Sequence, residues 1–373
     1  MIYLENSATT RAFDEAAEAV ARAMTRDFVN ISSPYAAALK AEKDFRAAMQ
    51  TAAQVLHARP DELILTSGGT ESDNTALFCA PAGSEVLLSA IEHTAVLSCQ
   101  RALEKRGCRV VICPVNTHGR VEADTLASLV NENTGLVSIM HVNNEIGSVN
   151  DLSALVKAVK TKNPKALFHS DGVQAFMHVC SDMKLLGVDL YSVSAHKLHG
   201  PKGAGLLYVR ADVPFTPYLF GGGQQNDRRS GTVNTPGALG FAAALTRLRS
   251  QEEFSAHLAR VKEAFVRELT ALPGARLICP DSAPHILSIA FEGVKASTLQ
   301  NALENELIIG KGSACSSRSS RVSHVLSGIG LPVSLAESTL RLSFGAFNTP
   351  EEAPIAASLI KEKIAYLRKF QRK

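Results

Sequence analysis

Short apolar segments recur through the first two thirds of the chain and alternate with longer amphipathic ones. The apolar segments are rich in aliphatic residues and are apolar throughout rather than at every second position. Such runs are typical of strands covered on both faces, and strands separated by helix-length segments indicate βαβ units in a mainly parallel sheet. The predicted strands are 62–66, 85–89, 109–113, 135–140, 166–169, 188–193 and 204–209.

Helical spacing fills most of the intervals between these strands. The last two predicted strands, 188–193 and 204–209, are joined too closely for a crossover helix, so we expect them to pair antiparallel. An Ala-rich amphipathic helix over 34–56 is expected to pack beside the sheet. The helices predicted between strands are 72–79, 94–105, 123–131 and 152–161.

The pattern changes near residue 251, where a long helical segment is followed by short strands and helices. A chain of 373 residues exceeds one compact core,. We therefore predict an α/β protein of two domains. Residues 13–250 form a mainly parallel seven-stranded sheet with helices on both faces. Residues 1–12 and 251–373 form a smaller α+β domain. Its predicted elements are helices 252–272, 296–304 and 350–369 and strands 275–279, 285–291 and 340–344.

Composition narrows the possible functions. The net charge is only +3 and charges of both signs are interspersed, which argues against direct nucleic-acid binding,. No apolar run approaches the ~20 residues of a membrane span, and the N-terminus lacks a secretory-signal pattern. The seven cysteines include no CxxC pair, which argues against a disulfide framework and against a cysteine-rich metal site,. A cytoplasmic location is expected, and Cys79, Cys108, Cys113 and Cys279 are expected in the core.

Lys197 ends the segment Ser194-Ala-His-Lys, which follows predicted strand 188–193 and precedes a Gly/Pro turn. A lysine at a strand end, beside a serine, a histidine and several glycines, is a candidate for Schiff-base formation with pyridoxal phosphate (PLP). A lone lysine is equally typical of a solvated surface charge. The assignment therefore depends on what stands at the other strand ends.

Polar residues that suit PLP follow several of those strands. Gly68 and Gly69 lie between a strand and a helix, where free N–H groups favour a phosphate. Asp171 would keep a pyridine nitrogen protonated, and Gln174 could bond the ring hydroxyl. His93 could stack on a flat ring and move protons. Each also fits a turn or a helix cap when taken alone. Their shared edge of the sheet, together with Asn144, favours one site.

The later part of the chain adds a nucleophile and an anion binder. Cys315 lies in a Gly/Ser-rich stretch with Lys311, Arg318 and Arg321 nearby, and cations stabilise a thiolate,. The alternative is an incidental surface thiol. Arg341 lies in predicted strand 340–344, and its planar fork suits a substrate carboxylate.

With these motifs the chain resembles the cysteine desulfurases of the NifS/IscS-like branch of the class V aminotransferases, which are PLP enzymes of fold type I. The resemblance runs from residue 3 to about residue 350. The motifs stand in family order: YLENSATT at 3–10, TSGGTESDN at 66–74, EH at 92–93, NNEIG at 143–147, DGVQ at 171–174, SAHK at 194–197, RSGT at 229–232 and GSAC at 312–315.

The resemblance implies a role for each matched residue. Lys197 joins the cofactor, Asp171 and Gln174 contact its ring, and His93 stacks on it. Cys315 receives the sulfur of L-cysteine as a persulfide, leaving L-alanine. The phosphate contacts implied are Gly69, Thr70, Ser194, His196 and, from the second subunit of a homodimer, Thr232. The substrate contacts implied are Asn30, Asn144 and Arg341.

The chain also departs from the family pattern. Tyr35 stands where a histidine is frequent, Asn6 belongs to a variable motif, and 221–229 lacks the usual Glu-Arg-Gly. Selenocysteine lyase, a PLP aminotransferase and a non-catalytic sulfur-transfer scaffold remain alternatives. The sulfur acceptor stays open between an iron–sulfur scaffold and a tRNA-thiolation enzyme.

Overall fold

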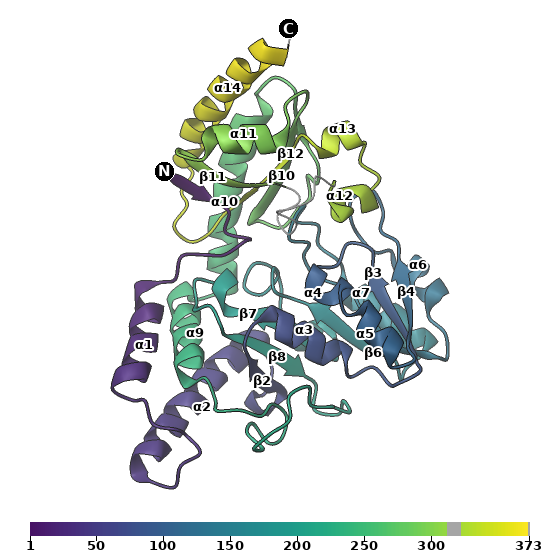
Figure 1. The fold of residues 1–373 in the computed structure, drawn as a ribbon, viewed down its shortest axis with the longest axis vertical. Coiled ribbons are helices and arrows are strands. Elements are labelled where there is room, and N and C mark those ends of the chain that lie inside the picture. The colour runs from purple at the N-terminus through teal and green to yellow at the C-terminus, as the bar shows by residue number, and fades with distance from the viewer. Residues whose placement is uncertain (312–321, 372–373) are drawn as a thin grey trace.

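The computed structural model of the chain describes residues 1–311 and 322–371, and two sheets organise them (Figure 1). The larger sheet has seven strands in the order β2-β8-β7-β6-β5-β3-β4. Its strands are β2 (Leu63–Thr66), β3 (Glu85–Ser89), β4 (Arg109–Cys113), β5 (Thr134–Ser138), β6 (Leu167–Asp171), β7 (Leu190–Ser194) and β8 (Gly205–Val209).

The larger sheet is parallel except at β8, which pairs antiparallel with both β7 and β2. This confirms the predicted α/β fold and the predicted antiparallel pair. Successive residues of one strand enter different cores: Leu87 packs in one apolar cluster, and Val86 and Leu88 pack in the other. Because both faces of the inner strands are buried, most of their positions carry apolar residues, with polar ones toward the ends of β6 and β7,.

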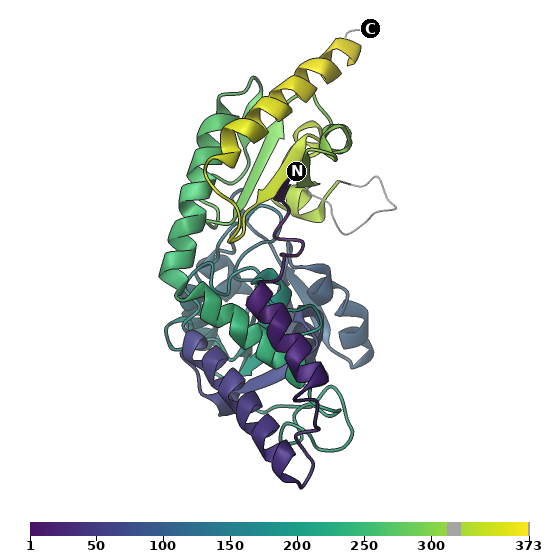
Figure 2. The same cartoon turned by 90° about the vertical axis from the view of Figure 1, so that its left-hand side faces the viewer.

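Helices cover both faces of this sheet. α3 (Gly69–Leu77), α4 (Thr94–Leu97) and α5 (Gln100–Lys105) pack on one face. The other face is covered by α2, α6, α7 and α9, and α1 packs against α9 (Figures 1 and 2). The remaining bounds are α1 (Asp14–Thr25), α2 (Ala36–Leu56), η1 (Pro60–Glu62), α6 (Ala123–Leu129), α7 (Leu152–Lys162), α8 (Met183–Leu186), η2 (Ala195–Lys197) and α9 (Thr235–Leu248).

The smaller sheet has the order β1-β11-β12-β10-β9. β1 (Ile2–Leu4) pairs parallel with β11 (Leu307–Lys311), so the first residues of the chain do cross to the smaller sheet, as expected. The domain boundaries proposed above stay predictions. The other elements of this part are β9 (Ala275–Leu277), β10 (Ile286–Phe291), β12 (Thr339–Ser343), α10 (Gln251–Thr270), α11 (Ala296–Leu303), α12 (His324–Gly328), α13 (Val333–Ala336) and α14 (Glu352–Gln371).

Some elements differ from the sequence-based expectation. The helix predicted over 94–105 is two helices, α4 and α5. The turn tightens between them, where the Cys99 amide donates to the Val96 carbonyl three residues back,. Strand β11 and helices α1 and α9 were not predicted. No helix in the described part of the chain is long and apolar enough to cross a membrane.

Gly172 fixes the chain where β6 ends. A Cβ at this position would overlap the ring of Tyr191, which is fully buried in β7. The Gly172 amide donates to the Ser192 carbonyl at 3.0 Å, and its own carbonyl accepts from the Ala175 amide at 2.8 Å. This close approach of backbone to ring sets the direction in which Asp171 leaves the strand.

We therefore expect Gly172→Ala to lower the free energy of unfolding by about 3 kcal/mol, because the added methyl overpacks a buried ring. Chemical denaturation would measure the change. Gly203→Ala is the matched control. It also lies in a turn, at φ +79°, where an added Cβ would meet no atom of a non-adjacent residue within 4 Å, and it should lose only about 1 kcal/mol. Equal losses for the two variants would contradict the account.

Candidate active site

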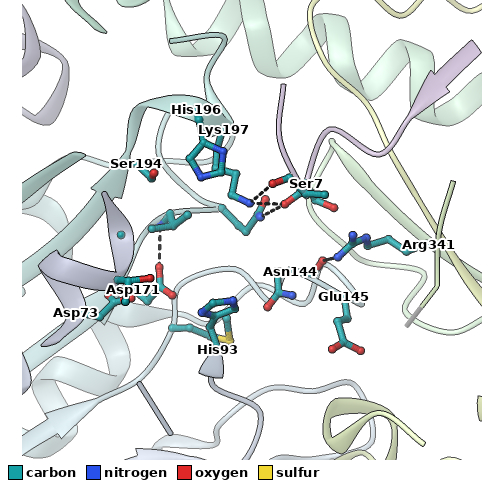
Figure 3. A pocket seen from close by; sticks show the side chains of 16 residues that line it. Ser7, Asp73, His93, Asn144, Glu145, Asp171, Ser194, His196, Lys197 and Arg341 are labelled. Atoms are coloured by element: carbon teal, nitrogen blue, oxygen red, sulfur yellow. Dashed lines mark hydrogen bonds between the residues drawn. The ribbon is translucent and has the colours of Figure 1, made fainter. Parts of the chain in front are cut away.

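Most residues assigned to the site from sequence line one pocket of about 290 Å³. Its walls come from strand ends of the larger sheet, from the N-terminal segment and from β12 of the smaller sheet (Figure 3). The predicted residues that line it are Gly69, Thr70, His93, Asn144, Asp171, Gln174, Ser194, His196, Lys197 and Arg341.

Lys197 ends η2, the single turn that follows β7. Its Nζ donates to the backbone carbonyls of Ser7 at 2.7 Å and Ala8 at 2.8 Å (Figure 3). The Gln174 amide donates to the same Ser7 carbonyl at 2.8 Å. The N-terminal segment thus orients a lysine and a glutamine that both face the pocket. Ser7 was missed from sequence because its contribution is a backbone oxygen.

One wall of the pocket is formed by Asp171 and His93, and it is called the acidic wall below after its carboxyl group. Asp171 is the last residue of β6, is 5% exposed, and accepts from the Val173 amide at 2.9 Å. Burial raises the pKa of Asp171, while His93 and Lys197 act in the opposite direction. His93 caps α4, where its Nδ1 accepts from the Ala95 amide at 3.1 Å. Burial lowers the pKa of His93, which favours a neutral ring,.

A second wall of the pocket, called the donor wall below, offers hydrogen-bond donors. Helix α3 begins at Gly69. A Cβ added to Gly69 would lie only 2.6 Å from Val173 Cγ2. The Ser194 hydroxyl is buried and has no hydrogen-bond partner among the described residues. Burial, aided by Lys197, lowers the pKa of His196 to about 4. Free helix N–H groups and an unpartnered hydroxyl suit a phosphate.

Arg341 reaches the pocket from β12 although it is 2% exposed. Its Nη1 donates to the Asn144 carbonyl at 2.7 Å, and its Nη2 lies 3.5 Å from Glu5 Oε1. Gly310 in β11 lies opposite Arg341, and a Cβ there would stand 3.0 Å from the guanidinium. The absence of a side chain at Gly310 therefore gives Arg341 its space, and a planar cation faces the pocket.

Two predicted residues are not brought to this pocket. Asn30 lies in the exposed loop after α1, where its side chain accepts from the Ser32 amide at 3.0 Å. Thr232 is exposed and does not line the pocket. Cys315 lies outside the described residues. Their assigned roles stay predictions.

Asp73 is the main lining residue that sequence reasoning left without a role. It lies within the helical segment that follows the glycine turn, and such a position is typical of an ordinary polar face of a helix. Its 1% exposure is the signal that only the structure supplies. The four cysteines expected in the core are buried. Among the described residues, no cluster of three or more His, Cys, Asp or Glu could hold a metal ion.

The residues fit PLP. The unpartnered Ser194 hydroxyl and the α3 N-terminus would hold its phosphate, Asp171 would face its ring nitrogen, and Lys197 would reach its aldehyde,. The sheet order, the parallel core and this pocket together define a PLP-dependent transferase of fold type I.

The class-V aminotransferase family matches residues 2–354 of the chain. The cysteine desulfurase IscS of Methanosarcina thermophila is 36% identical over 98% of this chain and 93% of its own. That of Clostridium botulinum strain Hall is 35% identical, over 99% and 96%. The chain belongs to the class-V aminotransferase family, whose members use PLP.

Solved structures agree with this assignment. A NifS-like protein superposes with a TM-score of 0.90 at 34% identity, over 98% of this chain and 99% of its own. SspA in complex with cysteine gives a TM-score of 0.83 at 27% identity, over 94% and 100%. The predicted resemblance to the NifS/IscS-like branch is thereby confirmed.

Glu92, next to His93, joins two strand ends behind the pocket. It is fully buried, and its Oε1 accepts from the Ser89 hydroxyl at 2.6 Å and the Met140 amide at 2.7 Å. Burial raises the pKa of Glu92 to about 8. The folded protein therefore binds a proton that the unfolded chain releases near pH 4. This contribution to stability is present at low pH and is lost as pH rises through about 8.

We expect Glu92→Gln to flatten this dependence, because its amide oxygen keeps both acceptor contacts and the side chain cannot ionise. Between pH 5 and 8 the variant should gain about 1 kcal/mol per pH unit relative to the parent protein. Denaturation at a series of pH values would show it. Parallel curves for the two proteins would mean that Glu92 is ionised in the folded state.

Proposed function

We propose that this protein is a PLP-dependent cysteine desulfurase that removes sulfur from L-cysteine, leaves L-alanine, and carries the sulfur as a persulfide on Cys315. The observation that carries the proposal is one pocket that combines Lys197, Asp171 and Arg341. The family assignment and the relatives named cysteine desulfurase support it.

Residues that flank Cys315 in sequence pair with residues that line this pocket. Gly310, five positions before it, lies opposite Arg341. Ser323, eight positions after it, donates its hydroxyl to the carboxylate of Glu145, which lines the pocket. Both ends of the segment that holds Cys315 are thus tied to the site. These contacts of the flanking residues support the proposal that Cys315 receives the substrate sulfur.

The planar guanidinium group of Arg341 is the proposed binding group for the substrate. Arg341 would hold the L-cysteine carboxylate by paired N–H donors, with the side chain of Asn144 as a further donor. Arg341 also holds the Asn144 backbone carbonyl, so the two donors are positioned together. Asn30 is proposed as a third contact. PLP, when bound, supplies an electron sink for the carbon that loses its proton.

The side chains then divide the proton and sulfur transfers. The Lys197 amine takes the Cα proton at Nζ, and the carbonyls of Ser7 and Ala8 orient it,. The Cys315 thiolate attacks the substrate sulfur, so that an S–S bond forms and the C–S bond breaks. The electron pair of the C–S bond remains with Cβ, which takes a proton, and the Cα proton returns from the Lys197 amine, so that the product is alanine. His93 is proposed to assist proton movement at this wall.

The protein is proposed to act as a homodimer in the cytoplasm and to pass its sulfur to an acceptor protein. The acceptor would be an iron–sulfur scaffold or a tRNA-thiolation enzyme. The exposed position of Thr232 supports a dimer in which this residue completes the phosphate site of the partner subunit. Exposed Phe220 and Tyr218, on the same connection as Thr232, provide apolar surface for such a contact.

Cys315→Ser is the direct test. Incubation of the parent protein with L-cysteine should add one sulfur to the peptide that holds Cys315, as mass spectrometry would detect. The variant should show no added sulfur and should form alanine at least about a hundredfold more slowly, because a hydroxyl cannot replace the thiolate nucleophile. Cys180→Ser, which removes the one exposed cysteine among the described residues, is the control and should behave as the parent.

Other outcomes identify the alternatives. Unchanged alanine formation in Cys315→Ser would point to an aminotransferase-like or lyase reaction that needs no persulfide. Activity on L-selenocysteine with none on L-cysteine would identify a selenocysteine lyase. Binding of PLP with no turnover of either substrate would favour a sulfur-transfer scaffold.

A further inference from the structure

A second buried carboxyl stands beside Asp171 at the acidic wall. Asp73, on α3, and Asp171, at the end of β6, both line the pocket and are 1% and 5% exposed. Both are labelled in the pocket view (Figure 3), and the charge of Asp171 raises the pKa of Asp73. Two buried carboxylates that interact in this way repel each other, so ionising both is unfavourable and the pair retains a proton.

The surroundings decide which carboxyl keeps that proton. His93 and Lys197 both favour an ionised Asp171. At Asp73, burial, Asp171 and Glu92 all raise the pKa, and only a hydrogen bond from Ser192 lowers it. Asp73 Oδ1 has no hydrogen-bond partner within the described part of the chain. An anionic oxygen buried without a donor is costly, whereas a neutral carboxyl is tolerated there.

A buried chain of neutral polar groups continues behind Asp73. His169 Nε2 lies 3.6 Å from Asp73 Oδ1 and 2.9 Å from the Ser192 hydroxyl, and His169 Nδ1 lies 2.8 Å from the Ser138 hydroxyl. Burial lowers the pKa of His169 to about 3, so its ring carries no charge to balance an anion. Ser192 is also the strand partner of Asp171. The chain therefore connects Asp73 with the strand that positions Asp171.

We propose that Asp73 is a positioning residue for Asp171. It holds the proton of the carboxyl pair, and this neutral side chain leaves Asp171 as the single anion facing the ring nitrogen of PLP. A neutral polar group is thus required at position 73, and a charge is not. The inference rests on the proposed cofactor site and gives a role to a residue that the family resemblance left without one.

Two substitutions at Asp73 distinguish the effect of its charge from the effect of its polarity. Asp73→Asn keeps a neutral polar side chain of the same shape, and Asp73→Val keeps the size without the polarity. Thr75→Val, at another buried position of α3 that does not line the pocket, controls for disturbance of the helix. Each purified protein would be freed of cofactor and titrated with PLP to measure its affinity. The visible absorbance of the reconstituted holoprotein would then be followed as pH is varied.

Asp73→Asn should bind PLP within about twofold of the parent affinity, and its absorbance titration should keep its midpoint. Asp73→Val should bind about tenfold more weakly, the loss expected for one buried hydrogen-bonding group. Thr75→Val should behave as the parent. A midpoint moved by one pH unit or more in Asp73→Asn would show that Asp73 is charged in the holoprotein and would overturn the proposal. Equal affinity of the Val and Asn variants would overturn it as well.

Thermal unfolding of the apoprotein gives a readout that needs no cofactor. A buried acid that keeps its proton adds stability at low pH that is lost as pH rises above the unfolded-state pKa. Asp73→Asn cannot ionise, so its melting temperature should gain on that of the parent as pH rises, and an unchanged difference would contradict a protonated Asp73. If the parent protein binds no PLP, the proposed function fails. If it binds PLP normally and the variants disagree, only the role of Asp73 fails.

Discussion

The N-terminal segment holds Lys197 of the candidate active site between the two sheets, and the geometry of the pocket depends on this contact. β1 lies in the smaller sheet, while the carbonyls of Ser7 and Ala8 accept from Lys197. The Thr10 amide and hydroxyl both bond the His196 carbonyl, at 3.0 and 2.9 Å. The turn that follows β7 in the larger sheet is thereby connected to the smaller sheet through the few residues that follow β1. These backbone contacts orient Lys197, which ends the single turn η2 after β7.

Burial gives the two walls of the pocket different electrostatic properties. At the donor wall the helix N-terminus, the Ser194 hydroxyl and a neutral His196 can receive a phosphate,. At the acidic wall, burial raises the pKa of the carboxyls, and Lys197 and His93 favour ionisation of Asp171. The same low-dielectric surroundings therefore support an anion at one position and a neutral acid at its neighbour. This separation matches a cofactor with a phosphate at one end and a basic ring nitrogen in its ring.

Much of this could be predicted from the sequence, for identifiable reasons. Strands buried on both faces carry mostly apolar runs, so the large sheet and the residues at its strand ends, including Lys197 and Asp171, were found. β11 was missed because its segment ends in Gly-Lys beside a Gly/Ser-rich stretch. The role of Ser7 depends on its backbone carbonyl and that of Asp73 on its burial, and residue type reveals neither. Asn30 and Thr232 do not line the pocket of the single chain, so their roles need a partner subunit or a different arrangement.

The central claim is that Lys197 is the residue through which the chain holds PLP. Borohydride reduction of the holoprotein would convert a carbon–nitrogen double bond to the cofactor into a stable single bond, and peptide mapping would locate it. The account predicts a pyridoxyl group on the peptide that holds Lys197, and its loss in Lys197→Ala with the fold retained. A pyridoxyl group on another lysine, or none in a protein that shows the absorbance of bound cofactor, would contradict it.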